Sequence, residues 1–125
     1  LRSVISAYRS SPFFEFYFDD YEPFFKRKHT FLVDLNMEIL SLNLEHCGIT
    51  TGYEISQAFL PPGEIDSRKW IHPKVDYRKD PYFSPRPYPQ VFTERFQFKA
   101  NLSILDMIFN LGPESRENLQ HSFIS

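Results

Sequence analysis

The chain has 125 residues and a formal net charge of −2, and 42% of its residues are hydrophobic. This length fits one domain or part of one, with enough apolar residues for a sizeable core. The mixed charges argue against a nucleic-acid-binding surface, which would need clustered basic residues, and the single cysteine, Cys47, excludes an internal disulfide and fits a reducing cytoplasm.

The start of the chain has the character of the middle of a structural element, and its first residue is Leu1 rather than Met. We therefore expect residues 1–125 to be the C-terminal part of a single domain whose N-terminal part is absent. On this hypothesis residues 1–7 are poorly anchored or expose an apolar face. No apolar run reaches the ~18 residues of a membrane span and no signal peptide opens the chain, so we expect a cytoplasmic protein without a membrane span.

Two amphipathic helices are predicted in the first half of the chain. The first opens at Pro12, with Ser10 or Ser11 as its cap, and Pro23 is expected to break or kink it, because proline disfavours helical geometry in the residue before it. The second covers residues 30–47 and ends at Gly48, in a left-handed cap. Residues 51–59 then have the pattern of a strand.

Residues 60–89 contain seven of the ten prolines together with several aromatic residues. Because disordered segments carry few aromatics, we predict an ordered, non-helical loop, with Trp70 and Tyr88 packed on the helix that follows. Helices are predicted at residues 90–96, 102–111 and 113–121. The predicted fold class is α+β, predominantly helical in this part, with a long ordered loop rich in proline and aromatic residues.

Several motifs resemble those of a known family. They are residues 7–14, the leucine-rich helix 30–47, Asp66-Ser67-Arg68 with Pro73-Lys74, and above all residues 88–92, Phe98, 101–106 and 110–113. This pattern resembles the C-terminal portion of the WbqC-like proteins, a bacterial family associated with gene clusters for O-antigen and other surface polysaccharides. The resemblance implies a role in polysaccharide biosynthesis. It also suggests transfer of an amino-acyl or similar group onto a sugar, with a nucleotide sugar or another small molecule as substrate.

Asp106 is the candidate catalytic residue. It lies in the apolar stretch LSILDMIFN, where a carboxylate must be paired, hydrogen-bonded or protonated. A structural alternative also explains it, since Asp106 can close a capping box with Ser103 or pair with Arg68 or Arg95.

The candidate substrate-binding residues surround Asp106 in the predicted arrangement. They are Tyr88, Gln90, Arg68, Asn101 and Ser103. The Gln90 amide both donates and accepts, as a sugar or peptide-like ligand requires, although a bond at a helix start explains it equally well. Asn101 and Ser103 are also typical helix caps. The predicted site brings Arg68 and Gln90 close to Asp106.

No metal site and no cofactor are predicted. The four histidines and Cys47 lack the spacing of metal ligands, and the isolated glycines form no phosphate-binding loop. A non-catalytic interaction or scaffold protein of the same pathway remains the alternative function. An enzyme would have a pocket lined by several of the candidate residues, whereas a scaffold would expose a large aromatic patch.

Overall fold

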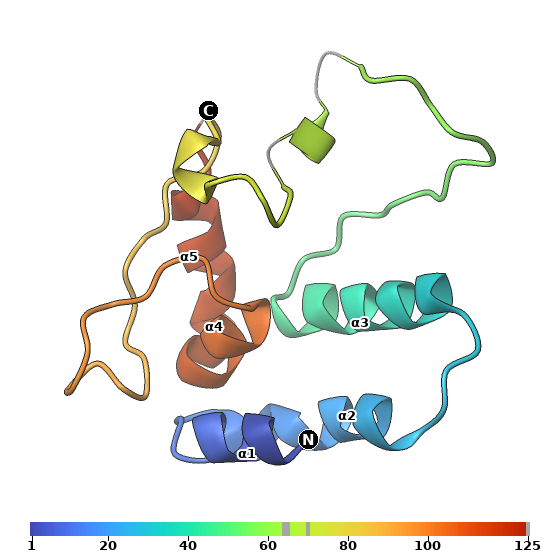
Figure 1. The fold of residues 1–125 in the computed structure, drawn as a ribbon. Coiled ribbons are helices and arrows are strands. Elements are labelled where there is room, and N and C mark those ends of the chain that lie inside the picture. Colours follow the sequence, from blue (N-terminus) through green and yellow to red (C-terminus); the bar gives the residue numbers. More distant parts are fainter. Residues whose placement is uncertain (64–65, 70, 125) are drawn as a thin grey trace.

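The computed structural model describes residues 1–63, 66–69 and 71–124. The α-helices of this part are α1 (Arg2–Tyr8), α2 (Phe14–Lys26), α3 (Leu32–His46), α4 (Ile104–Leu111) and α5 (Ser115–Ser122). Short 3-10 turns are η1 (Ser67–Lys69), η2 (Tyr77–Lys79) and η3 (Gly112–Glu114). Helices α2 and α3 lie side by side, and α4 and α5 form a column across the end of this pair (Figure 1). None of the described helices has the length and apolar character needed to cross a bilayer.

The predicted start of the first long helix is wrong. The Ser11 hydroxyl donates to the Tyr8 carbonyl at 2.6 Å and so closes α1 instead of capping α2. Helix α2 begins at Phe14, and Phe13 precedes it without a side-chain cap bond. The Phe13 amide donates to the Phe109 carbonyl of α4 at 2.9 Å. A long-range contact therefore sets this boundary, and local capping preference does not.

Pro23 does not break α2, which continues to Lys26. Proline removes one backbone donor from the helix interior. Two contacts span this point: the Arg27 amide donates to the Pro23 carbonyl at 3.0 Å, and Lys26 pairs with Glu22 at 2.7 Å. They hold the last turn in helical geometry despite the proline.

The predicted end of α3 is confirmed. Gly48 has φ +64°, a conformation that glycine adopts without steric cost. Its amide donates to the Glu45 carbonyl at 2.9 Å, and the Ile49 amide donates to the Leu44 carbonyl at 2.8 Å. This pair of bonds is the Schellman motif that satisfies the last carbonyls of a helix.

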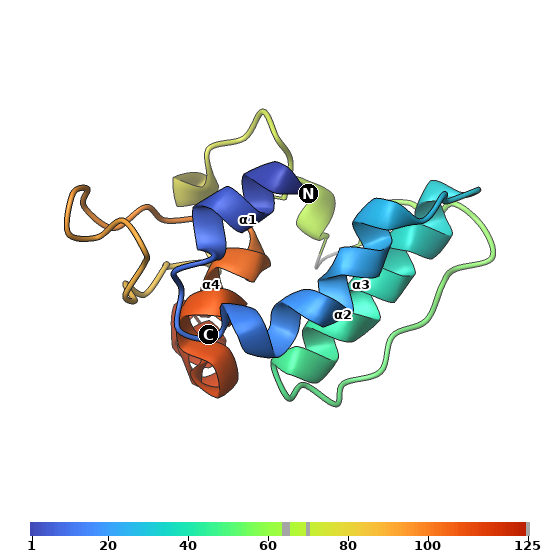
Figure 2. The same ribbon diagram turned by 90° about the horizontal axis from the view of Figure 1, so that it is seen from below.

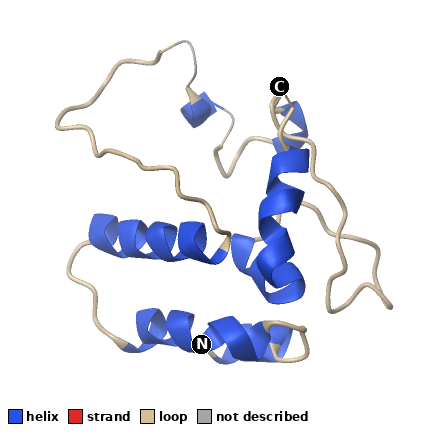
Figure 3. Ribbon diagram, turned by 180° about the vertical axis from the view of Figure 1, so that it is seen from behind, coloured by secondary structure: helices blue, strands red, loops and turns tan. Residues whose placement is uncertain are grey.

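The predicted strand at residues 51–59 is wrong. These residues form no strand, and Tyr53 and Ile55 are 46% and 60% exposed. In the described part of the chain, β-pairing is confined to an antiparallel bridge between Phe83 and Phe123. The fold is helical (Figure 3), and the α+β class is not confirmed.

The remaining predicted elements are partly confirmed. Among the described residues of the 60–89 segment there is no α-helix, only η1 and η2. Trp70 lies outside the described residues, so its predicted packing is not tested. Residues 91–95 form turns rather than a helix. The two C-terminal helices are present as α4 and α5, which the short turn η3 joins at Gly112.

The core surrounds Phe109 of α4, which has no exposed surface. Its ring centroid lies 5.2 Å from Phe14, 5.4 Å from Tyr8 and 5.9 Å from Tyr21. Seen from below, α1, α2 and α4 meet around this point (Figure 2). The N-terminal segment is anchored through one face of α1, because Val4 and Ile5 pack against this core, while Leu1 is 38% exposed.

Helix α3 is attached to α2 by polar contacts around Tyr21. The Tyr21 hydroxyl donates to Asn43 Oδ1 at 2.8 Å and lies 3.1 Å from His46 Nδ1. His46 Nε2 lies 3.0 Å from Asp20 Oδ2. Burial chiefly raises the pKa of Tyr21 well above its usual range. No residue of α3 itself is buried, so this helix lies at the edge of the core, where Leu42 packs against it.

Candidate functional site

A polar cluster around the buried Asp106 lies where α4 meets the loop before it. Ser103 caps α4, because its hydroxyl accepts from the Leu105 amide at 3.3 Å. Asp106 lies in the first turn of α4 and is 4% exposed. Its Oδ2 accepts from the Tyr88 hydroxyl at 2.7 Å and from Gln90 Nε2 at 2.9 Å. The structure thus brings together three of the residues that the sequence selected.

Gln90 links this cluster to the backbone of the following loop. Its Nε2 donates to the Lys99 carbonyl at 2.9 Å, and its Oε1 accepts from the Lys99 amide at 2.9 Å. The two side-chain donors and the acceptor of an amide are thereby all used. Gln90 is consequently a tether that closes the loop of residues 90–99 and fixes it on Asp106.

The donors to Asp106 are neutral, which differs from the predicted basic partner. Burial first, and then the hydrogen bond to Asp106, raise the pKa of Tyr88 far above the usual phenol range. Burial and Asp106 also raise the pKa of Tyr8. A phenol held in its neutral form keeps its proton and can donate to a carboxylate. Neither Arg68 nor Arg95 is a partner of Asp106 in the described contacts.

Of the capping box proposed for Ser103 and Asp106, only the cap at Ser103 is present. Ser103 is the cap, but its hydroxyl accepts from Leu105, and the Asp106 amide bonds to the Ser103 carbonyl at 2.9 Å. The carboxylate is directed at Tyr88 and Gln90 instead. Burial of Asp106, which the apolar neighbours predicted, is confirmed.

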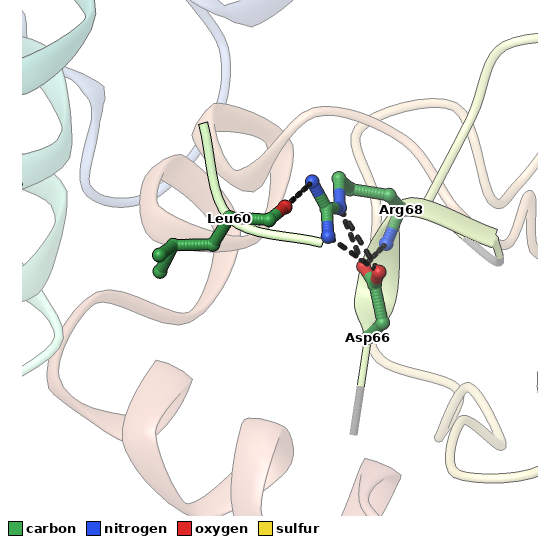
Figure 4. Close-up of polar contacts among 3 residues, drawn as sticks. All are labelled: Leu60, Asp66 and Arg68. Atoms are coloured by element: carbon green, nitrogen blue, oxygen red, sulfur yellow. Dashed lines mark hydrogen bonds and ion pairs between the residues drawn. The ribbon is translucent and has the colours of Figure 1, made fainter. Parts of the chain in front are cut away.

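Arg68 is held within its own segment. Its guanidinium donates to both carboxylate oxygens of Asp66, with the shortest distance 2.7 Å, and to the Leu60 carbonyl at 3.1 Å (Figure 4). It also lies over the Phe59 ring at 5.3 Å from the centroid. The hydrogen bond to Asp66 raises the pKa of Arg68. The predicted meeting of Arg68 with Asp106 is therefore not seen in the described contacts.

A cleft of about 890 Å³ opens between the proline-rich segment and the end of α5. Its lining is mainly apolar, with a few polar side chains. The lining residues are Gly63, Asp66, Ser67, Ile71, His72, Pro73, Val75, Tyr77, Asp80, Pro81, Tyr82, Phe83, Asn101, Leu119, Ser122 and Phe123. This volume lies in the range of small-molecule sites.

One wall of the cleft is built by pairing residues 82–84 with residues 122–124. The Ser84 amide donates to the Ser122 carbonyl, and the Ile124 amide donates to the Tyr82 carbonyl, both at 2.9 Å. The rings of Tyr82 and Phe123 stack at 6.4 Å with a 13° interplanar angle. These contacts attach the proline-rich segment to α5, although the described residues form no sheet.

The turn before this wall is fixed by local carboxylate contacts. Asp76 caps η2 by accepting from the Arg78 amide at 3.0 Å, and the Arg78 guanidinium lowers the pKa of Asp76 to about 2. Asp80 accepts from the Tyr82 amide at 2.9 Å. Short polar side chains that bond two residues ahead are typical of ordered turns. Contacts within residues 76–82 therefore fix this turn without help from α5.

Asn101 is the predicted substrate-binding residue that lines the cleft. It has φ +55°, a left-handed conformation that is uncommon outside glycine, although asparagine tolerates it best. It is not the cap of α4, which is Ser103. Such backbone outliers gather at functional sites, and Asn101 lies just after the loop that Gln90 tethers.

Several residues of the cleft were not predicted from sequence. Asp80 and Phe123 come from two segments that meet only in the folded chain. The aromatic content of the loop was a signal for Tyr82, but nothing near the C-terminus marked Phe123. Tyr8 was part of the recognised motif, yet its proximity to Asp106 depends on the packing of α1 against α4.

Comparison with known proteins gives one match. The model of the WbqC-like protein family matches residues 1–86. The matched range begins at the first residue and excludes residues 88–113, so the expectation that the likeness concerns the C-terminal portion of the family is not borne out. No curated protein and no solved structure matches this chain.

Proposed function

Since the chain belongs to the WbqC-like protein family, we propose that it acts in bacterial surface-polysaccharide biosynthesis as a group transferase that binds a nucleotide sugar. The observation that carries this proposal is the cleft of about 890 Å³. The sugar occupies the cleft, and one of its hydroxyl or amino groups attacks the acyl carbon of an activated donor. The new acyl bond forms as the bond to the donor's leaving group breaks, and the leaving group departs with the proton that the sugar group loses. The amino-acyl class of the group rests on the family resemblance alone.

The chemistry of the lining suits a sugar. Tyr82 and Phe83 offer apolar ring faces, on which the C–H faces of a sugar can pack. Asn101 and Asp80 supply amide and carboxylate groups, which bond sugar hydroxyls as donors or acceptors. An apolar cleft with a few convergent polar groups is the usual form of a small-molecule site.

The buried cluster has a positioning role in this proposal. Asp106, Tyr88 and Gln90 hold the loop that ends at Asn101, and Ser103 starts the helix beneath it. Asp106 is 4% exposed and does not line the cleft. A catalytic role for Asp106 predicts lost activity with unchanged melting, whereas the positioning role predicts that both fall together.

The test is binding of nucleotide sugars to the purified chain by titration calorimetry, beside the nucleoside diphosphate and the free sugar. Asn101→Gly removes the amide and keeps the backbone conformation accessible, and Tyr82→Ala removes one ring. We expect each variant to weaken binding at least about tenfold, the effect of losing one well-placed contact. Asn36→Ala and Tyr53→Ala, at exposed sites outside the cleft, serve as matched controls.

Two results would contradict the proposal. One is the absence of binding to every nucleotide sugar tested. The other is equal binding by the cleft variants and the controls. Turnover of a bound nucleotide sugar with a panel of amino-acyl donors then tests the transfer step itself.

The second candidate function is a non-catalytic interaction protein of the same pathway. The observation that favours it is the number of large apolar side chains left on the surface. Those most exposed are Phe16, Phe31, Leu32, Phe59, Ile71 and Phe123, each more than 60% exposed. Large exposed apolar patches mark interaction sites. Absence of nucleotide-sugar binding would leave this function as the better account.

A further inference from the structure

Asp80 is a fixed carboxylate in the wall of the cleft. Its amide donates to the Tyr77 carbonyl at 3.0 Å, and its Oδ1 accepts from the Tyr82 amide at 2.9 Å. These bonds fix the backbone and one carboxylate oxygen, whereas Oδ2 has no bonding partner in the described part of the chain. The residue is half-buried. Because a partly desolvated carboxylate without a counter-ion is costly, this position favours a positively charged ligand.

The rest of the described lining offers no cation that would compete for Asp80. It contains no lysine and no arginine. The other carboxylate of the lining, Asp66, pairs with Arg68 at 2.7 Å (Figure 4), so its charge is already offset. His72 Nδ1 accepts from the Lys74 amide at 3.1 Å, which leaves one proton, on Nε2, and a neutral ring. The cleft therefore favours a positive group over a negative one.

Aromatic rings of the lining add to this preference. Tyr77 and Phe83 meet edge to face with centroids 6.1 Å apart, and Tyr82 stacks on Phe123. All four line the cleft. The face of an aromatic ring is negative and attracts a cation that lies within about 6 Å of its centre. Ring faces beside an unpaired carboxylate are the combination that binds ammonium groups.

We propose that the cleft binds a protonated primary amine of the substrate, and that Asp80 is the residue that selects it. This inference rests on the proposed function and narrows its substrate. The amine belongs either to an amino sugar or to the amino-acyl group that is transferred. A bound sugar amine loses one proton to water before it can attack an acyl donor.

The diphosphate of a nucleotide sugar lies outside the cleft in this arrangement. Lys74 and Lys79 are the lysines nearest to the lining along the chain, and both are exposed residues that do not belong to it. The sugar end of the ligand then provides the selectivity, because it alone enters the cleft.

Titration calorimetry at pH ~7, where most of a primary amine is protonated, tests the sugar as the source of the amine. We expect UDP-glucosamine to bind at least about tenfold more tightly than UDP-glucose, since a charge-assisted contact is worth about that factor. UDP-N-acetylglucosamine, whose nitrogen is uncharged, should resemble UDP-glucose.

Asp80→Asn removes the charge and keeps an oxygen that can accept from the Tyr82 amide, so the turn is retained. We expect the preference for the amine to fall to about one in this variant. Asp76→Asn is the matched control, because Asp76 accepts from the Arg78 amide in the same kind of turn but does not line the cleft. It should keep the preference, and circular dichroism checks that both variants fold.

Glycinamide and acetamide, which differ by one amino group, test the amino-acyl source in the same way. Binding of glycinamide alone, lost in Asp80→Asn, assigns the amine to the transferred group, even if no nucleotide sugar binds and the proposed function fails. Equal binding of the three nucleotide sugars, with no binding of glycinamide, overturns the inference and leaves the proposed function standing. A preference for the amine that Asp80→Asn retains would also overturn the role of Asp80.

Discussion

At the residue scale, Asp106 is a buried carboxylate that depends on neutral donors. Its Oδ2 accepts from Tyr88 and Gln90, and a cation is not among its described partners. Buried polar groups are costly unless each is hydrogen-bonded. The pair of donors therefore ties the stability of α4 to the conformation of the loop that precedes it.

Replacement of Asp106 tests this dependence. We expect Asp106→Ala to lower the free energy of unfolding by about 2–4 kcal/mol, because two partly buried donors lose their acceptor. Urea unfolding followed by circular dichroism measures the change. Asp34→Ala, at an exposed position of α3, is the control and should change stability by less than about 0.5 kcal/mol. Equal stability of the two variants would show that the cluster contributes nothing.

Ionisation of Tyr88 makes the free energy of unfolding depend on pH in the alkaline range. Its pKa is raised by burial and by Asp106, so the unfolded chain loses the phenol proton first as the pH rises. Stability from this group is present below pH ~10, the ordinary phenol value, and falls above it. We expect Tyr88→Phe to be about 1–3 kcal/mol less stable at pH 7 and to show a shallower loss between pH 9 and 11. Tyr82→Phe is the control, and an identical alkaline slope in both variants would exclude this contribution.

At the element scale, Gly112 is the joint between α4 and the C-terminal turn. It has φ +53°, and a Cβ at this position would lie 2.6 Å from a ring carbon of Phe13. The Phe13 backbone is held by the hydrogen bond from its amide to Phe109, and its ring has Phe16 and Tyr17 as neighbours, which limits how far the ring can move away. The direction of the last helix thus depends on a residue without a side chain.

Gly112→Ala combines two costs, the left-handed conformation and the overlap with Phe13. Each is typically about 1–3 kcal/mol, so we expect a loss of about 2–5 kcal/mol in thermal or urea unfolding. Gly52→Ala is the matched control, because nothing lies within 4 Å of its added Cβ and its φ is not positive. A Gly112→Ala chain as stable as the Gly52→Ala chain would contradict this account of the joint.

At the scale of the whole molecule, the middle of the proline-rich segment is joined to the C-terminus through a short bridge. Residues 82–84 pair with residues 122–124, and the Tyr82 ring stacks on Phe123. The Arg86 backbone also bonds to the side chains of Ser122 and Asn118 in α5. Phe123 is nevertheless 64% exposed. The attachment of this wall of the cleft is therefore weaker than the core around Phe109.

We expect Phe123→Ala to release this wall without unfolding the molecule. Local opening has a lower free energy than global unfolding where few apolar contacts are buried. Hydrogen exchange in residues 71–84 should rise at least about fivefold, while the melting temperature should change little. Ile124→Ala, which leaves the ring stack intact, is the control. Unchanged exchange in the Phe123→Ala chain would show that other contacts hold the segment.

The sequence by itself determined the features that depend on near neighbours. Gly48 ends α3 because glycine adopts the left-handed conformation at no steric cost, and the apolar neighbours of Asp106 predicted its burial. Membership of the family was likewise recognised from motifs along the chain, although the matched range is residues 1–86. Helical periodicity and capping involve residues only a few positions apart, so the sequence alone can predict them.

Only the tertiary structure decided which distant segments meet. Residues 51–59 have a strand pattern but no partner strand, and a strand without a partner leaves its backbone groups unpaired. Arg68 bonds with Asp66 two residues away instead of reaching Asp106, and Asn101 faces a cleft whose other wall comes from the end of the chain. These outcomes depend on how α4 and α5 pack, because the contacts concerned join residues far apart in the sequence.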